Sequence, residues 1–350
     1  MRKNIKKHFD IIFKDKFNLL LIFVFLLGNI VNLGLFFNWF MIAVSSYTVI
    51  GNNYIQTIGS FIVNNKKRSK INWIFLSFSF IITTLISWFI YEGEVDYSLL
   101  KNIEYQKDLD IVIILIPLLL NIFTKYGIPV SATFLIIPLF STSNTIHIMI
   151  TKTITSYFLA FIVSFFIWSF IYKNFINKIK NTSEDLNRLW NIAEYITTAL
   201  VWMAWNILSI CVFVVFVDRQ FNIYELIIFN MIIIFILYLL INNSGGKIEK
   251  IIKEKRDSNN KKTVTIFNLI FAIILLYLQF FSNVPLTTTW VFLGLLAGKE
   301  LAMTYVESSL FASGRNMKAS IAKIIVDLNK AIVGIVFSLI FVKVVLFFVK

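Results

Sequence analysis

The stretch WIFLSFSFIITTLISWFIY, from Trp73 to Tyr91, contains no charged residue and has the length of a membrane-crossing helix. A helix needs about 20 apolar residues to cross the hydrocarbon core of a bilayer. Similar runs recur along the 350-residue chain, which is 58% hydrophobic and has a mean hydropathy of +0.79. Soluble domains are closer to half apolar, so the excess indicates that lipid is a second solvent for this chain.

We expect an all-α polytopic integral membrane protein with about 11 membrane segments. The first apolar run is too long for the core of a signal peptide, and we expect it to be a retained helix. The expected segments are 17–40, 43–64, 72–91, 110–124, 129–150, 153–173, 190–217, 223–242, 263–281, 285–305 and 330–349.

Positive charge is concentrated between these segments. The net charge is +14, and 25 of the 33 Lys and Arg residues lie in five clusters beside apolar runs. The positive-inside rule produces this distribution, so we expect the chain in the cell (inner) membrane with a cytoplasmic N-terminus. The rule also explains the positive charge, so no nucleic-acid partner is expected. The acidic loop 92–109 is then expected outside. The basic clusters are residues 1–16, 65–70, 173–188, 247–262 and 315–330.

Two polar motifs occur in the same order in each half of the chain. NNYIQTIGS at Asn52–Ser60 is followed by GIPVSATF at Gly127–Phe134, and WNILS at 205–209 is followed by VPLTTTW at 284–290. The offset between the halves is 153 residues for the first motif and 156 for the second. Recurrence at nearly one offset indicates an internal repeat.

We interpret the repeat as inverted, because a unit of five segments places the second copy upside down. The equivalent loops 92–109 and 243–262 agree, since the first is acidic and the second is basic. Inverted repeats are typical of secondary transporters, with the substrate site near the midplane between the units. The expected divisions are a first membrane repeat at 1–150, a second at 151–310, and a basic loop with a final helix at 311–350.

The motifs supply amides and hydroxyls where helices are expected to break. Pro138 interrupts the segment after the first motif pair, and Gly294 and Gly298 interrupt its counterpart. A broken helix exposes backbone N–H groups that, with the helix dipole, bind an anion. The alternative is that the hydroxyls bond their own backbone and the amides only join helices. The candidate substrate-binding residues are Asn52, Asn53, Gln56, Ser60, Ser131, Thr133, Asn206, Ser209, Thr287, Thr288 and Thr289.

These stretches resemble the signatures of the inorganic phosphate transporter (PiT) family, which includes related sulfate permeases. That family carries N-D-V-A-N-A-x-G-T in each half, followed by P-V-S-T-T-H. Asn52–Ser60 aligns with the first signature without gaps, 129–134 and 285–290 match the second, and Asn206 with Ser209 matches the first loosely. The resemblance implies an inverted-repeat permease with ion-coupled uptake of a tetrahedral oxyanion, phosphate first and sulfate close behind.

The chain departs from the family at four positions. Both signature aspartates are amides, at Asn53 and Asn206, and both histidines are aromatic, at Phe134 and Trp290. An amide keeps a carbonyl oxygen but cannot titrate and carries no charge. We therefore expect little or no dependence on sodium, with a proton favoured over sodium as the coupling ion.

Three charged residues lie in a late apolar context, Lys299, Glu300 and Glu307. The two glutamates are seven residues apart on one helix face, which makes them candidates to carry a coupling proton. The alternative is that Lys299 and Glu300 lie at a helix end and reach water with their long side chains.

Other function classes have weaker support. The two histidines, His8 and His147, are far apart and no Cys/His metal spacing exists, so no enzyme activity, cofactor or metal is expected. A membrane-embedded transferase would need a polar catalytic loop, and loop 92–109 contains no histidine. A non-transporting or degenerate membrane scaffold stays open because of the amide replacements. The oligomeric state is also open, a homodimer included.

Overall fold

The computed structural model describes residues 34–54, 56–103, 105, 110–126, 130–180, 184–242, 261–310 and 316–349. These residues form helices joined by loops, with one isolated antiparallel bridge between Glu94 and Gln220. The helices are α3 (Gly34–Asn53), α4 (Gly59–Asn64), η1 (Lys66–Arg68), α5 (Ser69–Ile90), η2 (Ile111–Ile114), α6 (Leu115–Tyr126), α7 (Ala132–Ile136), η3 (Ile137–Phe140), α8 (Ser143–Lys180), α9 (Glu184–Val214), α10 (Ile223–Asn242), α12 (Lys261–Phe281), α13 (Thr288–Leu310) and α14 (Met317–Val349).

Six helices in the described part of the chain are long and apolar enough to cross a membrane. The all-α, multi-pass membrane class predicted from the sequence is therefore confirmed, whereas the count of 11 segments and the inverted repeat stay predictions. The six spans are Lys66–Ile90, Ser143–Asn174, Arg188–Val214, Ile223–Asn242, Lys261–Phe281 and Met317–Phe347.

The outer helices expose many large apolar side chains. Phe78 and Phe89 on α5, and Phe158, Phe166 and Phe170 on α8, are all more than half exposed. Contiguous apolar surface of this kind is unfavourable in water and matches a hydrocarbon solvent.

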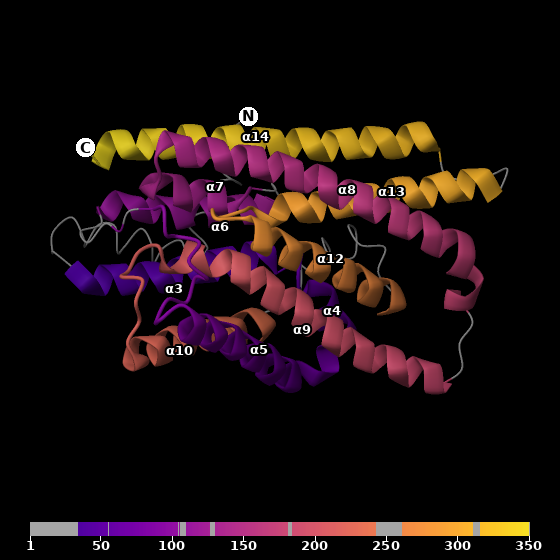
Figure 1. The fold of residues 1–350 in the computed structure, drawn as a ribbon, viewed down its shortest axis with the longest axis horizontal. Helices are drawn as coiled ribbons and strands as arrows, with labels where there is room; N and C mark the ends of the chain where they lie inside the picture. The colour runs from indigo at the N-terminus through magenta and orange to yellow at the C-terminus, as the bar shows by residue number, and fades with distance from the viewer. Residues whose placement is uncertain are drawn as a thin grey trace, which may run out of the picture.

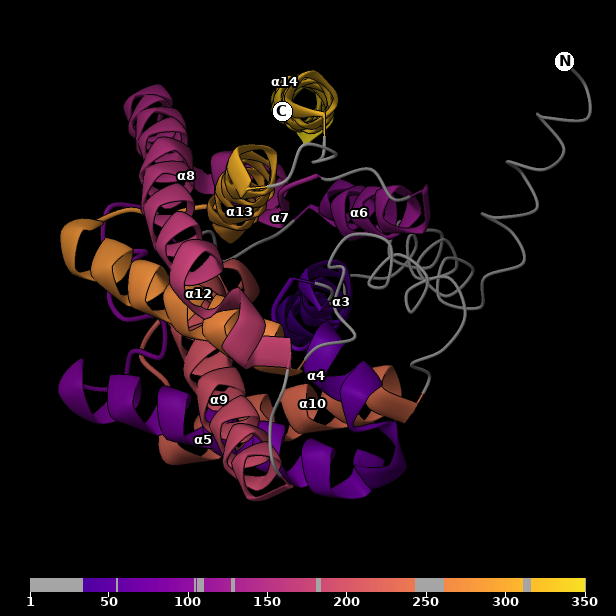
Figure 2. The same ribbon diagram turned by 90° about the vertical axis from the view of Figure 1, so that its right-hand side faces the viewer.

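Helix α9 occupies the centre of the bundle, as 72% of its membrane span is buried against 28–50% for the other five. It packs against α12 along one side and against α5 and α3 on others, while α8 lies along α13. Figure 2, a view along the bundle, shows α14 on the outside beyond α13, and α5 and α10 together at the opposite edge.

The basic clusters that the structure describes gather at one end of the bundle. Figure 1 shows the end of α8 and the beginnings of α9, α12 and α14 on its right-hand side, with α4 nearby. Hydrogen bonds from Asn64 to Glu194 and from Lys261 to Asn191 join three of these segments. The loop after α5 lies at the other end, where the Phe221 N–H donates to the Gly93 carbonyl. The acidic loop and the ends of the 243–262 loop are thus on opposite sides of the bundle, although residues 243–260 lie outside the described ones.

The expected segment 129–150 is wrong as a single crossing. Its described part divides into α7, the 3-10 turn η3 and the first turns of α8, which begins at Ser143. Pro138 lies at the start of η3, where its ring and missing N–H prevent an α-helix from continuing. Helix α8 then runs for 38 residues, through the expected repeat boundary at 150.

The expected segment 43–64 is also divided. Helix α3 ends at Asn53 and α4 begins at Gly59, so the first polar motif forms an irregular turn between them. Residues 34–40, expected in the segment 17–40, belong to α3, which is described from Gly34. Residues 17–33 of that expected segment lie outside the described ones. Amide side chains compete with the backbone for hydrogen bonds, which favours a break here.

Two further expectations are corrected in the C-terminal part. Helix α13 runs without interruption through Gly294 and Gly298, which were expected to break it. The two glycines instead let α13 approach α8 closely. The basic residues from Lys318 to Lys330, expected in a loop, lie on α14, which begins at Met317.

Candidate functional site

The turn between α3 and α4 is held against the segment that precedes α7. The Asn52 side-chain amide donates to the Val130 carbonyl at 3.0 Å, 78 residues away in the sequence. Within the turn, the Gln56 N–H donates to the Asn53 carbonyl at 2.9 Å and the Gly59 N–H to the Tyr54 carbonyl at 2.7 Å. These bonds satisfy the backbone locally and leave the amide side chains to contact other segments.

The first turn of α13 contacts the same break from the second half of the chain. The Thr289 hydroxyl donates to Asn53 Oδ1 at 3.4 Å and accepts from Gln56 Nε2 at 3.3 Å. All three side chains are at least nine-tenths buried. The structure thus joins the first motif to the last, across more than 230 residues of sequence.

Helix α9 completes the cluster through its tryptophans. The Trp205 indole N–H donates to the Thr288 hydroxyl at 3.0 Å, and Trp205 stacks on Trp202 with ring centroids 5.1 Å apart. The neighbouring Asn206 donates to the Trp202 carbonyl at 2.8 Å. Asn206 Oδ1 and the Thr287 hydroxyl are buried with no hydrogen-bond partner among the described residues.

The remaining candidates belong to the same four motifs and are also buried. Ser131 precedes α7 as its N-cap without a side-chain capping bond, and Thr133 follows on α7. Ser60 lies on α4 and Ser209 lies one turn beyond Trp205 on α9. Each of the four side chains is less than one-tenth exposed. All four predicted motifs therefore converge on one buried region.

Every candidate side chain is a neutral amide or hydroxyl. The strongest local dipole comes from the N-terminus of α13, which has 23 residues; α7 has only five, so its contribution is small. The region offers hydroxyl, amide and indole donors together with backbone N–H groups at a helix start. This combination suits an anion that is held by hydrogen bonds rather than by a fixed positive charge.

A separate cavity of about 380 Å³ lies between α13 and α14, and none of the candidate substrate-binding residues lines it. Glu300 lies there, 3.9 Å from the Lys323 ammonium. Lys299 lies in the middle of α13 and is only 8% exposed, with its ammonium 5.0 Å from the Trp168 ring centroid. The interpretation that Lys299 and Glu300 lie at a helix end is therefore wrong, because both are in the middle of α13. The Glu307 side chain lies outside the described ones.

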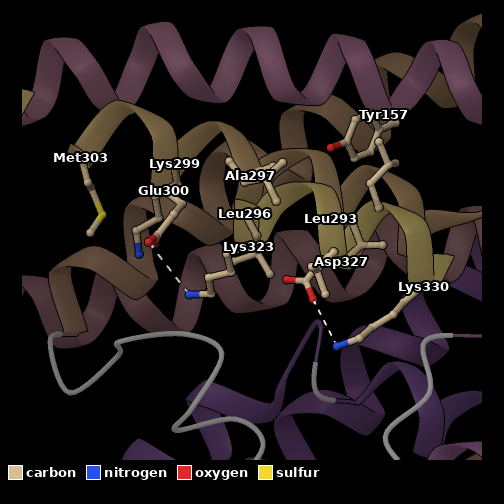
Figure 3. Close-up of a pocket in the computed structure, with 13 residues that line it drawn as sticks. Tyr157, Leu293, Leu296, Ala297, Lys299, Glu300, Met303, Lys323, Asp327 and Lys330 are labelled. Carbon is tan, nitrogen blue, oxygen red and sulfur yellow. Dashed lines mark ion pairs between the residues drawn. The ribbon is translucent and has the colours of Figure 1, made fainter. Parts of the chain in front are cut away.

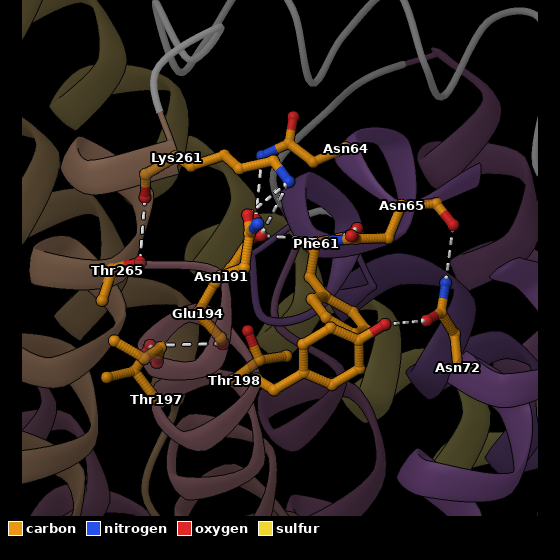
Figure 4. Close-up of polar contacts among 12 residues, drawn as sticks. Phe61, Asn64, Asn65, Asn72, Asn191, Glu194, Thr197, Thr198, Lys261 and Thr265 are labelled. Carbon is orange, nitrogen blue, oxygen red and sulfur yellow. Dashed lines mark hydrogen bonds and ion pairs between the residues drawn. The ribbon is translucent and has the colours of Figure 1, made fainter. Parts of the chain in front are cut away.

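Sequence reasoning missed one buried carboxylate, Glu194 on α9, which is fully buried. Its two oxygens accept from the side-chain amides of Asn64 at 3.0 Å and Asn65 at 3.3 Å, and Lys261 lies 3.8 Å away (Figure 4). The cluster ties together the end of α4, α9 and the start of α12 at the basic end of the bundle. A lone acid within the expected segment 190–217 was the signal that could have revealed it.

The chain matches no protein-family model, and comparisons with curated proteins and with solved structures give no match.

Proposed function

We propose that this chain is a secondary transporter for an inorganic tetrahedral oxyanion, phosphate first and sulfate close behind. The observation that carries the proposal is the hydrogen-bonded convergence of the four motifs. Asn53, Gln56 and Thr289 meet across the two halves of the chain, and Trp205 reaches Thr288 beside them. Polar groups gathered at helix breaks inside a bundle are the usual place of a transporter site.

The bond lengths suggest which contacts an anion would replace. N–H···O bonds in proteins are usually about 2.7–3.2 Å long. The Asn52–Val130 and Trp205–Thr288 bonds, both 3.0 Å, fall in this range. The N–H···O bond from Gln56 to Thr289, at 3.3 Å, is longer. The O–H···O bond from Thr289 to Asn53, at 3.4 Å, is also long for its type, which usually measures about 2.5–3.0 Å. In the proposed mechanism the short bonds keep the segments in place. The donors of Thr289 and Gln56 turn to the incoming anion together with the first N–H groups of α13.

The packing of the two halves supports an inverted repeat. Helix α5 packs on α9 and α10 packs on α3, while α5 and α10 contact each other, as exchange by a two-fold axis requires. The Thr84 hydroxyl donates to Asn230 Oδ1 at 3.0 Å in the last of these contacts. In the repeat, α5 corresponds to α10 and the α3–α4 pair to α9.

The orientation follows from charge. The described basic clusters lie at one end of the bundle, and we propose that this end is cytoplasmic. Single cysteines at the exposed Lys67 and Lys101, in a Cys211→Ala background, test it with an impermeant thiol reagent. The cysteine at 101 should react from outside intact cells and the one at 67 only after lysis. Reaction of both from the same side contradicts the topology.

The function itself is tested by uptake of labelled phosphate and sulfate into proteoliposomes that contain the purified protein. Replacing Thr289 with Val keeps the side-chain shape and removes one hydroxyl. Loss of a hydrogen bond to a charged group costs about 1.5–3 kcal/mol, so apparent affinity should fall about 10- to 150-fold. The matched control is Thr83→Val on α5, because among the residues that the structure describes the Thr83 hydroxyl bonds only the Ser79 carbonyl of its own helix.

Each alternative has its own outcome in this experiment. Uptake of neither anion by a folded protein would favour the scaffold, whose cluster would then serve only to join helices. Turnover of an added lipid substrate would favour a transferase. Equal affinity of the wild type and the Thr289→Val variant would show that this hydroxyl is structural and would remove the proposed site.

A further inference from the structure

The cavity between α13 and α14 has an apolar floor and a charged rim (Figure 3). Its volume, about 380 Å³, is within the range of small-ligand sites. Tyr157 of α8 closes one end. The floor residues are Leu293, Leu296, Ala297 and Met303, and the rim residues that carry charge are Glu300, Lys323, Asp327 and Lys330, with Lys299 behind them.

The rim carries both signs of charge in two loose pairs. The Lys323 ammonium lies 3.9 Å from Glu300, and the Lys330 ammonium lies 4.0 Å from Asp327. Both lysine side chains are at least 60% exposed, so their ammonium groups can turn to another partner. Ion pairs at such distances with an exposed lysine contribute little to stability, so a ligand can replace them at a small free-energy cost.

The position of the rim along α14 places it at a membrane surface. From Ala331 to Val349 the helix has 19 residues, about 28 Å at 1.5 Å per residue, close to the thickness of the hydrocarbon core. The only charge in this part is Lys343, which is two turns from the end and can extend to the interface. The charged residues from Lys323 to Lys330 come directly before it, at the basic end of the bundle.

We propose that this cavity binds the headgroup of a phospholipid with a primary ammonium group, of the phosphatidylethanolamine class. The lipid phosphate lies between Lys323 and Lys330, and its ammonium group lies at Asp327 and Glu300. The acyl chains follow the lipid-exposed apolar face of α14, which includes Val333 and Val336. The two exposed lysines and the two carboxylates suit a zwitterion, because its phosphate then meets Lys323 and Lys330 while its ammonium group meets Asp327 and Glu300.

The test measures lipid retained by the purified, detergent-solubilised full chain, by native mass spectrometry after incubation with phosphatidylethanolamine or phosphatidylglycerol. The wild type should retain phosphatidylethanolamine at least several-fold better. The Lys323→Ala/Lys330→Ala variant should lose retention of both lipids. The matched control is Lys318→Ala, because Lys318 is an exposed lysine on the same helix and does not line the cavity.

A second variant, Asp327→Asn, removes one negative charge and keeps the shape of the side chain. Asp327→Asn should keep phosphate binding but lose the preference for phosphatidylethanolamine over phosphatidylglycerol, and its thermal unfolding should match that of the wild type. Equal retention of the two lipids by the wild type, or unchanged preference in Asp327→Asn, would overturn the proposal. Displacement of the lipid by millimolar inorganic phosphate would also overturn it, since the cavity would then be a site for the free anion.

Discussion

Gly298→Ala should destabilise the contact between α8 and α13, which approach each other closely at this glycine. Gly294 and Gly298 are four residues apart on α13 and face Ala160 and Ser164, four apart on α8. This arrangement of small residues on both sides lets two membrane helices approach closely. A Cβ added at 298 would collide with the Phe161 carbonyl oxygen and would lie 2.9 Å from both the Phe165 nitrogen and Ser164 Cβ.

The expected loss in the free energy of unfolding depends on which atoms the added Cβ would meet. Overpacking a well-packed site costs about 1–3 kcal/mol, and the upper end applies here because two of the three obstacles are backbone atoms that cannot rotate away. Alanine is favoured over glycine in a helix by about 1 kcal/mol, which offsets part of the cost. We expect a net loss of about 2 kcal/mol in the free energy of unfolding. The bond from the Ser164 hydroxyl to the Leu295 carbonyl, 2.7 Å, should be lost as well.

The assay is equilibrium unfolding in mixed micelles of a mild detergent and SDS, followed by tryptophan fluorescence, because buried Trp168 and Trp290 report on this region. The matched control is Gly51→Ala on α3, where an added Cβ would meet only Leu240 Cδ2, at the ordinary distance of 3.7 Å. That variant should be neutral or slightly stabilised. If Gly298→Ala unfolds with the wild type, or if both variants lose stability equally, the close-packing argument is refuted.

Three further predictions concern charge. Glu194→Gln should lower the free energy of unfolding by about 1–3 kcal/mol, because the new side-chain NH₂ group faces the NH₂ group of Asn64 or Asn65. Glu92→Gln, at an exposed position, is the control in the same unfolding assay. Burial raises the pKa of Asp96 above its ordinary value of 3.8, so the folded state binds the proton of this carboxyl more tightly than the unfolded state. The free energy of unfolding should therefore fall as pH rises from 3.8 through the raised pKa. Asp96→Asn should remove this dependence on pH, and an unchanged dependence would show that other groups cause it. Replacing sodium with choline at fixed pH should leave the initial rate of anion uptake unchanged, and a large drop would show that Asn53 and Asn206 still support a sodium site.

Uniform apolar runs bounded by charges could be located closely from the sequence. The expected segments 72–91, 223–242 and 263–281 match α5, α10 and α12 to within three residues at each end. The run from 129 to 172 could not be divided correctly, because it has only one charged residue, Lys152, and that residue lies inside α8. Glycines at 294 and 298 suggested a break, although in lipid the same residues serve close packing.

For the candidate site, the sequence pattern indicates which motifs meet but not which hydrogen bonds join them. The repeat hypothesis predicts that the motifs meet, since nearly equal offsets would place equivalent segments about one axis. The individual bonds could not be predicted. In the sequence Trp205 is only the first residue of its motif, yet in the structure its indole N–H donates to the Thr288 hydroxyl and links α9 to α13. Glu194 was overlooked because a single acid hardly changes the hydropathy of its segment. Burial turns that acid into a junction of three helices, because a carboxylate without water needs several donors and only neighbouring helices can supply them.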